Sequence, residues 1–349
     1  MRQSQPGQKV TIFDVAERAQ VSIKTVSRVV NREPNVRDST REKVEKAIRS
    51  LRYQPDQSAR NLASQHSHLI GLVYDDPERY ALPSAGFIIR MQQGALRACR
   101  AGLHELLIHP CDFSKRNIGS ELRSLIRATR LSGIVLAPPL SNMPRVVRAI
   151  HSTNTPLVRL SPGRRLAQEW YVETNDREVS AQMIDHLVEL GHRDIAFIKG
   201  NETHKAVGNR YLGYLDGLAR YDIKVKNSWI RQGDNAFNSG EQAAKELLAL
   251  SKRPSAIFAA NDDMAAGAMR YVLRQGLRVP QDISVAGFDD VTLSRQLDPR
   301  LTTIRQPVAR MTEHAVSLLA QSTTTEPQGH CVAASLAIRE STGPALHSR

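Results

Sequence analysis

From His68 onward, short segments rich in Val, Ile and Leu alternate with longer segments of helical periodicity. The strand-like segments form two sets, first HLIGLVYD, HELLIHP, SGIVLAPP and PLVRL, and then DIAFIKG, WIRQGD, SAIFAAND and ISVAGFDD. Such alternation is typical of a parallel, doubly wound α/β sheet. Because the two sets divide near residues 161–165 (SPGRR), we expect two α/β lobes with a cleft between them.

The first sixty residues follow a purely helical pattern. Thr11 can cap a short helix, with Asp14 at the capping-box position, and Ser22 can cap a second helix after a tight turn. A third helical pattern follows in STREKVEKAIRSL. The apolar positions expected to meet in a small core are Ile12, Val15, Ala16, Ala19, Val26, Val29, Val30, Val44, Ala47, Ile48 and Leu51. This arrangement predicts a small all-α helix-turn-helix unit.

The second predicted helix has a polar side opposite its valines. The residues on or beside this polar side are Ser22, Ile23, Lys24, Thr25, Ser27, Arg28 and Asn31. A polar helix face is most often only solvated, and the pattern alone leaves that interpretation open. A helix held by valines can also present its first turn and polar side to a DNA major groove, where Arg28 could read guanine.

The charge distribution favours an anionic partner near the amino terminus. The whole chain carries a net charge of +13, and residues 1–62 contribute 13 basic against 7 acidic side chains. Positive charge is therefore several times denser there than in the rest of the chain. A basic surface can also serve only solubility, so charge alone does not decide the question.

Several protein classes are disfavoured by the sequence. The opening MRQSQPGQKV lacks the apolar run of a signal peptide, and no segment approaches the length of about 18 apolar residues that spans a bilayer. Cys99, Cys111 and Cys331 lie too far apart for a metal motif and suit buried thiols in a reducing cytoplasm. Since the common nucleotide-binding, hydrolase and metalloprotease motifs are missing, we expect no enzyme activity, no cofactor and no metal.

Polar residues cluster where the predicted strands end. In open α/β sheets, ligands bind beyond the carboxyl ends of the strands. The side chains expected there are Tyr74, Asp75, Asp176, Asp234, Asn261, Asp262, Asp289 and Asp290. Asp and Asn often serve only as helix N-caps, so each residue alone is a weak indication. Their concentration at strand ends predicts a ligand-binding cleft.

Three amino-terminal segments, VTIFDVAERAQVSIKTVSRVVN, TREKVEKAIRSLRYQP and SARNLAS, resemble the DNA-binding headpiece of the lactose-repressor/galactose-repressor family. The segments HLVELGHRDIAFIKG, NRYLGYLDGL, FAANDDMAAGAM, VPQDISVAGFDD, LTTIRQP and IRESTGP resemble the effector-binding core of that family, which is itself similar to periplasmic sugar-binding proteins. The resemblance extends from Lys9 to Pro344. It implies a ligand-responsive transcriptional regulator, usually a repressor.

The resemblance implies specific DNA contacts. The second helix would lie in the major groove, and a linker helix would insert Leu62 into the minor groove. Ile23 departs from a hydrogen-bonding reader and would sense a thymine methyl group or shape. The full set expected at DNA is Thr11, Ser22, Ile23, Lys24, Thr25, Ser27, Arg28 and Asn31 in the headpiece, with Ala59, Arg60 and Leu62 in the linker.

The resemblance also implies an effector site. Motif matching places Asp176, Arg210, Asn261, Asp289 and Gln306 at ligand-contact positions. Asn235 and Ala137 depart from residues that other members have, so Phe237, Tyr74 or Tyr80 could supply a stacking face instead. The expected effector residues are Tyr74, Asp75, Asp176, Arg210, Asn235, Phe237, Asn261, Asp289 and Gln306. Carboxylate, amide and guanidinium groups suit the hydroxyls of a sugar, or less well a nucleoside.

These observations lead to one expected organisation. Residues 1–54 form the headpiece, 55–67 a hinge helix and linker, and 68–345 the effector-binding core. The N-lobe is expected over about 68–161 and 296–325 and the C-lobe over about 165–291 and 330–345, with crossings near 161–165, 291–296 and 322–330. The expected partners are double-stranded operator DNA, a small effector and a second copy of the chain, because the tail has no heptad run for tetramers. A sugar-binding or nucleoside-binding receptor without DNA regulation remains the alternative.

Overall fold

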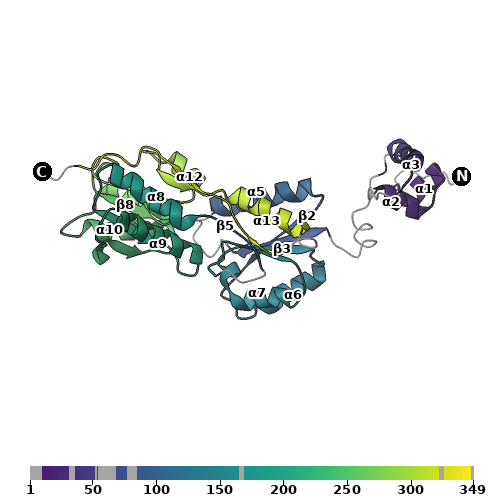
Figure 1. The fold of residues 1–349 in the computed structure, drawn as a ribbon, viewed down its shortest axis with the longest axis horizontal. Helices are drawn as coiled ribbons and strands as arrows, with labels where there is room; N and C mark the ends of the chain where they lie inside the picture. The colour runs from purple at the N-terminus through teal and green to yellow at the C-terminus, as the bar shows by residue number, and fades with distance from the viewer. Residues whose placement is uncertain are drawn as a thin grey trace. The chain divides into compact units, whose positions relative to one another are not determined.

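A computed structural model describes residues 10–30, 36–51, 53, 68–76, 85–164, 169–321 and 326–346. The chain forms two compact units, residues 1–67 and residues 68–349 (Figure 1). None of the helices in the described ranges is long and apolar enough to cross a membrane. Cys99 and Cys111 are buried as expected, whereas Cys331 is exposed.

The first unit contains three helices around a small core. They are α1 (Ile12–Ala19), α2 (Ile23–Val30) and α3 (Asp38–Leu51). The backbone N–H of Thr11 donates to Asp14 Oδ2 at 2.7 Å, and the backbone N–H of Thr25 donates to Ser22 Oγ at 3.1 Å. These contacts confirm the first two predicted caps. The third cap was predicted one position late, since α3 begins at Asp38 rather than after Ser39.

The second unit begins with a parallel sheet of six strands in the order β11-β5-β4-β3-β1-β2. The strands are β1 (Leu69–Asp75), β2 (Glu105–Cys111), β3 (Gly133–Leu136), β4 (Leu157–Leu160), β5 (Trp170–Glu173) and β11 (Gly329–Cys331). Helices α5 (Ala85–Ala101) and α13 (Val308–Gln321) share one apolar core with the sheet. Helices α6 (Ile118–Thr129) and α7 (Pro144–His151) share the other, with the short helix η2 (Leu140–Asn142) beside them. We call this lobe the N-lobe.

A second parallel sheet, of order β7-β6-β8-β9, forms the C-lobe. Its strands are β6 (Ile195–Lys199), β7 (Ile230–Gln232), β8 (Ala256–Ala259) and β9 (Ser284–Ala286). The surrounding helices are α8 (Asp176–Glu189), α9 (Lys205–Arg220), η3 (Asn227–Trp229), α10 (Phe237–Leu248), α11 (Asp262–Arg274) and α12 (Thr292–Gln296). A two-stranded antiparallel sheet of β10 (Thr303–Arg305) and β12 (Ser335–Ala337) completes this lobe. The predicted α/β core of two doubly wound lobes is confirmed.

The lobe boundaries differ from the expected ones at all three crossings. Strands β5 and β11 belong to the N-lobe sheet, and β10 is bridged to the C-lobe at Asp289 and Arg305. The chain therefore crosses after Glu173, after Arg305 and after Cys331, not near 161–165, 291–296 and 322–330. The polar segment SPGRR connects β4 to β5 within one sheet. Turn residues show that a chain turns, but not that it changes lobe.

The crossing segments run side by side. The backbone N–H of Ala334 in the third crossing donates to Asn175 Oδ1 in the first at 2.8 Å. The Gln306 amide nitrogen in the second crossing lies 3.5 Å from Thr174 Oγ1 in the first. All three crossings therefore form one connection at the base of the cleft.

Candidate functional site

Helix α2 presents a polar surface to solvent. Ser22, Lys24 and Arg28 are exposed, and the apolar side chain of Ile23 is 41% exposed at the start of the helix. Thr25 and Ser27 are half-buried. Val26 and Val29 are buried in the core of the unit, as the pattern predicted. The expected DNA-contact residues Asn31, Ala59, Arg60 and Leu62 lie outside the described residues.

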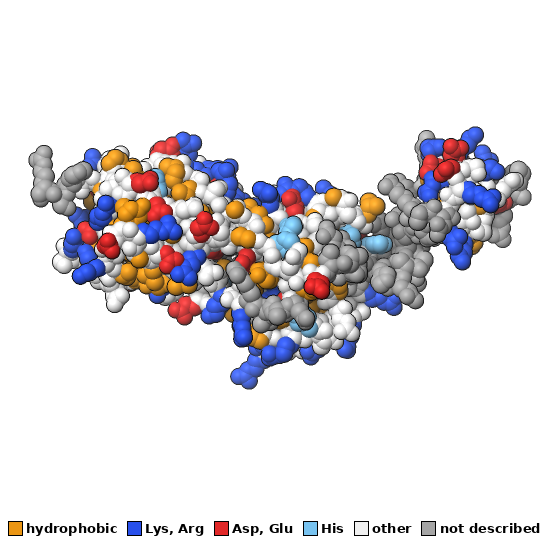
Figure 2. All heavy atoms as spheres, in the orientation of Figure 1, with side chains coloured by type: hydrophobic (Ala, Val, Ile, Leu, Met, Phe, Trp, Pro, Cys, Tyr) orange, Lys and Arg blue, Asp and Glu red, His pale blue; other side chains and the backbone are white. Residues whose placement is uncertain are grey.

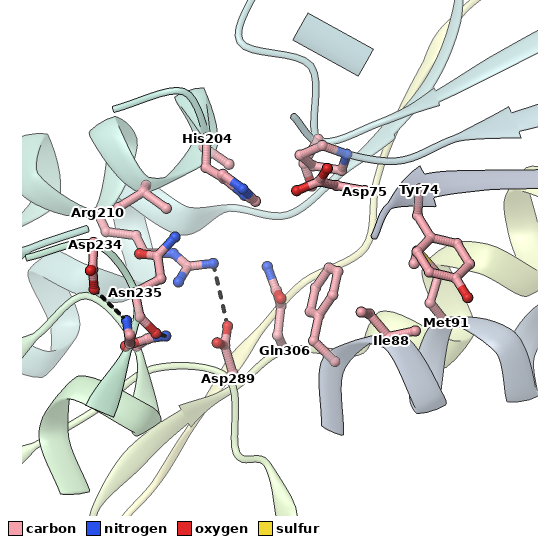
Figure 3. A pocket seen from close by; sticks show the side chains of 17 residues that line it. Tyr74, Asp75, Ile88, Met91, His204, Arg210, Asp234, Asn235, Asp289 and Gln306 are labelled. Atoms are coloured by element: carbon pink, nitrogen blue, oxygen red, sulfur yellow. Dashed lines mark hydrogen bonds and ion pairs between the residues drawn. The ribbon is translucent and has the colours of Figure 1, made fainter. Parts of the chain in front are cut away.

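A pocket in the second unit is lined by residues from both lobes (Figure 3). Seven of the nine expected effector residues line it, namely Tyr74, Asp75, Arg210, Asn235, Asn261, Asp289 and Gln306. The polar side chains stand mainly on the C-lobe, at the ends of strands and the starts of helices. Figure 3 shows them opposite Tyr74, Ile88 and Met91 of the N-lobe. The pocket therefore has one polar wall and one apolar wall.

Arg210 is the centre of the polar wall. This residue of α9 is 6% exposed, and its Nε donates to Asp176 Oδ2 at 3.2 Å. Its Nη2 lies 3.4 Å from Asp289 Oδ1, and its Nη1 donates to the carbonyl oxygen of Ala260 at 2.5 Å. The guanidinium also lies over the ring of Phe288, at 3.7 Å from the centroid. Arg210 thus holds two buried carboxylates in one place.

Asp289 is held in an unusual backbone conformation. Its φ is +113°, and the φ of Asp290 is +52°, a region that non-glycine residues seldom adopt. The next side chain, Asp290, is fully buried and accepts hydrogen bonds from Arg295, Arg305 and Arg339. This buried network secures the turn and aims Asp289 into the pocket, as Figure 3 shows.

Asn235 and Asn261 join two loops beside the pocket. Asn261 caps α11, because its Oδ1 accepts the backbone N–H of Met264 at 3.0 Å. Its amide nitrogen donates to the carbonyl oxygen of Asn235 at 2.8 Å. Asn235 has a φ of +75°, and its Oδ1 accepts the backbone N–H of Asn201 at 3.1 Å. Asn235, expected where relatives have an aromatic residue, therefore fastens the loop rather than offering a ring.

Two expected effector residues do not line the pocket. Asp176 lies behind Arg210, where it is 3% exposed and acts through the guanidinium. Phe237 lies instead under the guanidinium of Arg270, at 4.5 Å from the ring centroid. An aromatic residue two positions after Asn235 begins α10, and the helix turns its ring away from the cleft.

The apolar wall was missed by the sequence analysis. It consists of Phe87, Ile88 and Met91 of α5 together with Pro138. On a helix, these residues show the same periodicity as residues that pack on a sheet, so no pattern separates the two roles. His204 on the polar side was also missed, because it follows no predicted strand.

The electrostatics of the pocket favour hydroxyl groups. Burial raises the pKa of Asp289 to about 6, even though Arg210 beside it acts in the opposite direction. Burial and the neighbouring Arg210 lower the pKa of His204 to about 4, so the imidazole is neutral at pH 7. The side-chain oxygen Oε1 of Gln306 is buried without a hydrogen-bond partner among the described residues. Such groups can accept and donate hydrogen bonds in turn. No cluster suited to a metal ion occurs among the residues described.

The raised pKa of Asp289 predicts a pH-dependent stability. Because the pKa is about 6 in the folded protein and 3.8 as the model value, the folded state binds the proton more tightly. The stability contributed by this group is full below about pH 4 and is lost as pH rises through 6. Relative to Asp289→Asn, the wild-type free energy of unfolding should fall by about 2 kcal/mol between pH 4 and pH 7. Denaturant unfolding of both proteins at four pH values measures this; a constant difference would show that Arg210 keeps Asp289 ionised throughout.

Contacts outside the crossings also join the two lobes. Arg90 of α5 donates from Nη1 to the carbonyl oxygen of Asp289 at 3.1 Å and from Nη2 to that of Asp290. Gly163 lies so close to Lys205 at the start of α9 that a Cβ there would come within 2.0 Å of the lysine Cβ. Helix α5 thus contributes to the apolar wall and is tied to the backbone of the polar wall.

Comparison with known proteins places both units. Residues 11–56 match the model of bacterial regulatory proteins of the lacI family, and residues 184–342 match a periplasmic binding protein-like domain. The chain is 35% identical over 302 residues to the probable HTH-type transcriptional repressor ExuR of Bacillus subtilis, covering 86% of this chain and 88% of that one. The lac repressor dimer bound to operator and an anti-inducer shares 30% identity with a TM-score of 0.78, over 96% of this chain and 100% of that one. A complex of the transcriptional regulator CelR with cellobiose shares 28% identity with a TM-score of 0.73, over 95% of this chain and 100% of that one. All three relatives are transcriptional regulators rather than enzymes, and the chain belongs to the lacI family of bacterial regulatory proteins.

Proposed function

We propose that this protein regulates transcription by binding a pseudo-palindromic operator as a homodimer, in response to a small sugar-like effector held between the lobes. The observation that carries the proposal is that one chain holds both an exposed polar face on α2 and a pocket whose walls come from two lobes. We expect it to act in the cytoplasm, usually as a repressor of carbohydrate-utilisation genes. DNA contacts are assigned to Thr11, Ser22, Ile23, Lys24, Thr25, Ser27, Arg28 and Asn31, and to Ala59, Arg60 and Leu62 in the linker.

The pocket supports a sugar-like effector. Hydroxyl groups can pair with the carboxylate of Asp289 and the amide of Gln306, while the apolar face of a sugar ring can pack on Phe87 or Met91. The relative CelR was solved with cellobiose, which is a ligand of this kind. A nucleoside, the less favoured choice, would need a flat aromatic slot, and Phe87 is the candidate for one of its walls.

A homodimer is supported by apolar side chains exposed on neighbouring elements of the N-lobe. Ile89 and Leu96 on α5 are 50% and 40% exposed, and Ile108 on the adjacent edge strand β2 is 43% exposed. Single exposed apolar residues are ordinary, but three on one helix and the edge strand beside it are typical of an interface. The relative lac repressor binds its operator as a dimer.

The two sites can be coupled through the angle between the lobes. A ligand that contacts both walls stabilises one lobe arrangement over others. In a dimer, that arrangement determines the separation of the two linkers and therefore of the two headpieces. Arg90 supports this mechanism because it ties α5 to Asp289, so a change at the polar wall acts directly on the N-lobe.

The first experiment is selection of binding sites from random duplex DNA by the purified full chain at about 0.1 M salt, where exposed charges are screened within about 10 Å. An enriched palindrome is the expected result. The selected operator then serves to screen sugars for an effect on affinity. A ligand that binds the core but leaves operator affinity unchanged at constant salt would refute the coupling.

Arg28 should distinguish base reading from charge. Replacing Arg28 by Ala should cost about 1–3 kcal/mol on the selected operator and relax specificity at one base pair, because a bidentate guanine contact is lost. The control is Arg49→Ala on α3, which removes the same charge from an exposed position. Binding to operator and to random duplexes measures both effects. Equal losses on the two DNAs would assign Arg28 to phosphate contact.

A further inference from the structure

Four arginines at the ends of N-lobe helices carry exposed and unneutralised charge. They are Arg100 in the last turn of α5, Arg127 and Arg130 at the end of α6, and Arg148 in the last turn of α7. Within the described ranges, none of their side chains forms an ion pair or a hydrogen bond. Figure 2 shows Lys and Arg side chains standing out from the part of the N-lobe that α6 and α7 form in Figure 1.

The helix dipole accounts for only part of this pattern. Cations are favourable at helix carboxyl ends, which explains why arginines stand there. In the C-lobe, however, arginines at or just after helix ends meet acids: Arg220 lies 2.6 Å from Asp185, Arg274 lies 3.3 Å from Glu241, and Arg278 lies 2.9 Å from Asp282. The N-lobe keeps its charge available, and the one acid that begins a strand beside these ends is Glu105.

The topology brings the four arginines to one edge of the sheet. In each βα unit the helix returns antiparallel to the strand, so the helices end at the edge where the strands begin. Strand β1 begins at Leu69, directly after residues 1–67. The four arginines therefore stand at the edge of the core to which the headpiece is joined by a short linker. When the headpiece is on DNA, this is the tethered edge.

We propose that Arg100, Arg127, Arg130 and Arg148 form a second, sequence-independent contact with the phosphate backbone of duplex flanking the operator. Guanidinium groups pair with phosphate oxygens in bidentate fashion and release condensed counterions from the duplex. The contact adds affinity and salt dependence without reading bases. The inference rests on the proposed operator binding, and it locates an additional DNA surface on the core.

The test compares two lengths of the selected operator, one without flanks and one with about 20 base pairs added on each side. The variant carries Arg100→Gln, Arg127→Gln, Arg130→Gln and Arg148→Gln in the full chain. The wild type should bind the long duplex at least about tenfold more tightly than the short one at low salt. The variant should lose this gain and keep its affinity for the short duplex. The slope of log affinity against log salt on the long duplex should fall by about 3–4, or about 0.9 for each lost contact.

A charge-matched control separates a local contact from net charge. It carries Arg220→Gln, Arg270→Gln, Arg274→Gln and Arg278→Gln, which remove the same charge from the C-lobe, and it should behave as the wild type. Equal losses on short and long duplexes, equal losses in the control, or a wild type indifferent to flanks would overturn the inference. Failure of the proposed function looks different, since the wild type would then not prefer operator over random duplex at all. Thermal melting of both variants verifies that they fold.

Discussion

Replacing Arg210 by Ala is expected to lower the free energy of unfolding of the core by about 3–5 kcal/mol and to abolish effector binding. Removing one partner of a buried ion pair leaves the other charge without compensation in a poorly hydrated site. Here the change strands two carboxylates, Asp176 with its side chain 3% exposed and Asp289 with its side chain 13% exposed. It also leaves the carbonyl oxygen of Ala260 without its donor. Few single substitutions in the core remove so many contacts.

Arg177→Ala is the matched control. Arg177 also lies in the C-lobe and also pairs with an aspartate, Asp216, but its side chain is 57% exposed. Exposed pairs contribute little to stability, so this variant should unfold close to the wild type. Denaturant unfolding of the three proteins, followed by intrinsic fluorescence, provides the comparison. If Arg210→Ala unfolded together with the control, the buried site would have to be well hydrated, and the electrostatic account of the pocket would be wrong.

The headpiece was predictable from the sequence because its determinants are local. Caps at Thr11 and Ser22 and a helical repeat of small and β-branched residues are all written within sixty residues. The buried set Val15, Ala19 and Val26 follows directly from that repeat. The one error, the start of α3, lies at a helix end, where a single residue of difference depends on which side chain reaches the backbone.

The polar half of the pocket could be predicted and the apolar half could not. Asp289 and Asn261 follow strands, and the carboxyl edge of a parallel sheet is where ligands bind, so topology alone located them. Phe87 and Met91 lie on α5, and whether such residues face a sheet or a cleft depends on where the other lobe sits. The lobe crossings failed for a related reason, because pairing of β5 and β11 within the first sheet is a long-range event.

The left-handed turn at Asp289 is a feature that only the structure reveals. The letters FDD announce two acids but not that the first would enter a pocket while the second is fully buried. The two neighbours accordingly differ in charge chemistry. Burial outweighs the attraction of Arg210 at Asp289 and raises its pKa, whereas at Asp290 the hydrogen bonds from three arginines outweigh burial and hold the pKa well below its usual value.

The second large effect is expected for Asp290→Asn, which should destabilise the core by about 3 kcal/mol or more at pH 7. Asparagine keeps the shape but removes the charge on which three guanidiniums converge. Arg295 and Arg305 can turn to solvent, since their side chains are 53% and 54% exposed, but Arg339 is 12% exposed and would remain buried without a counter-ion. These arginines come from α12, β10 and the segment after β12, so one substitution loosens three parts of the C-lobe.

The pH dependence of this difference identifies its cause. A carboxyl whose pKa is depressed in the folded state contributes stability above its unfolded pKa, here 3.8, and loses it as pH falls further. The gap between wild type and Asp290→Asn should therefore be constant from pH 7 to about 5 and shrink below about 4, opposite in sign to the behaviour expected at Asp289. Asp282→Asn, which affects only the exposed pair with Arg278, serves as control and should change stability little. A gap that persisted undiminished at pH 3 would mean that Asp290 acts through shape and hydrogen bonding, and that the arginines around it do not need its charge.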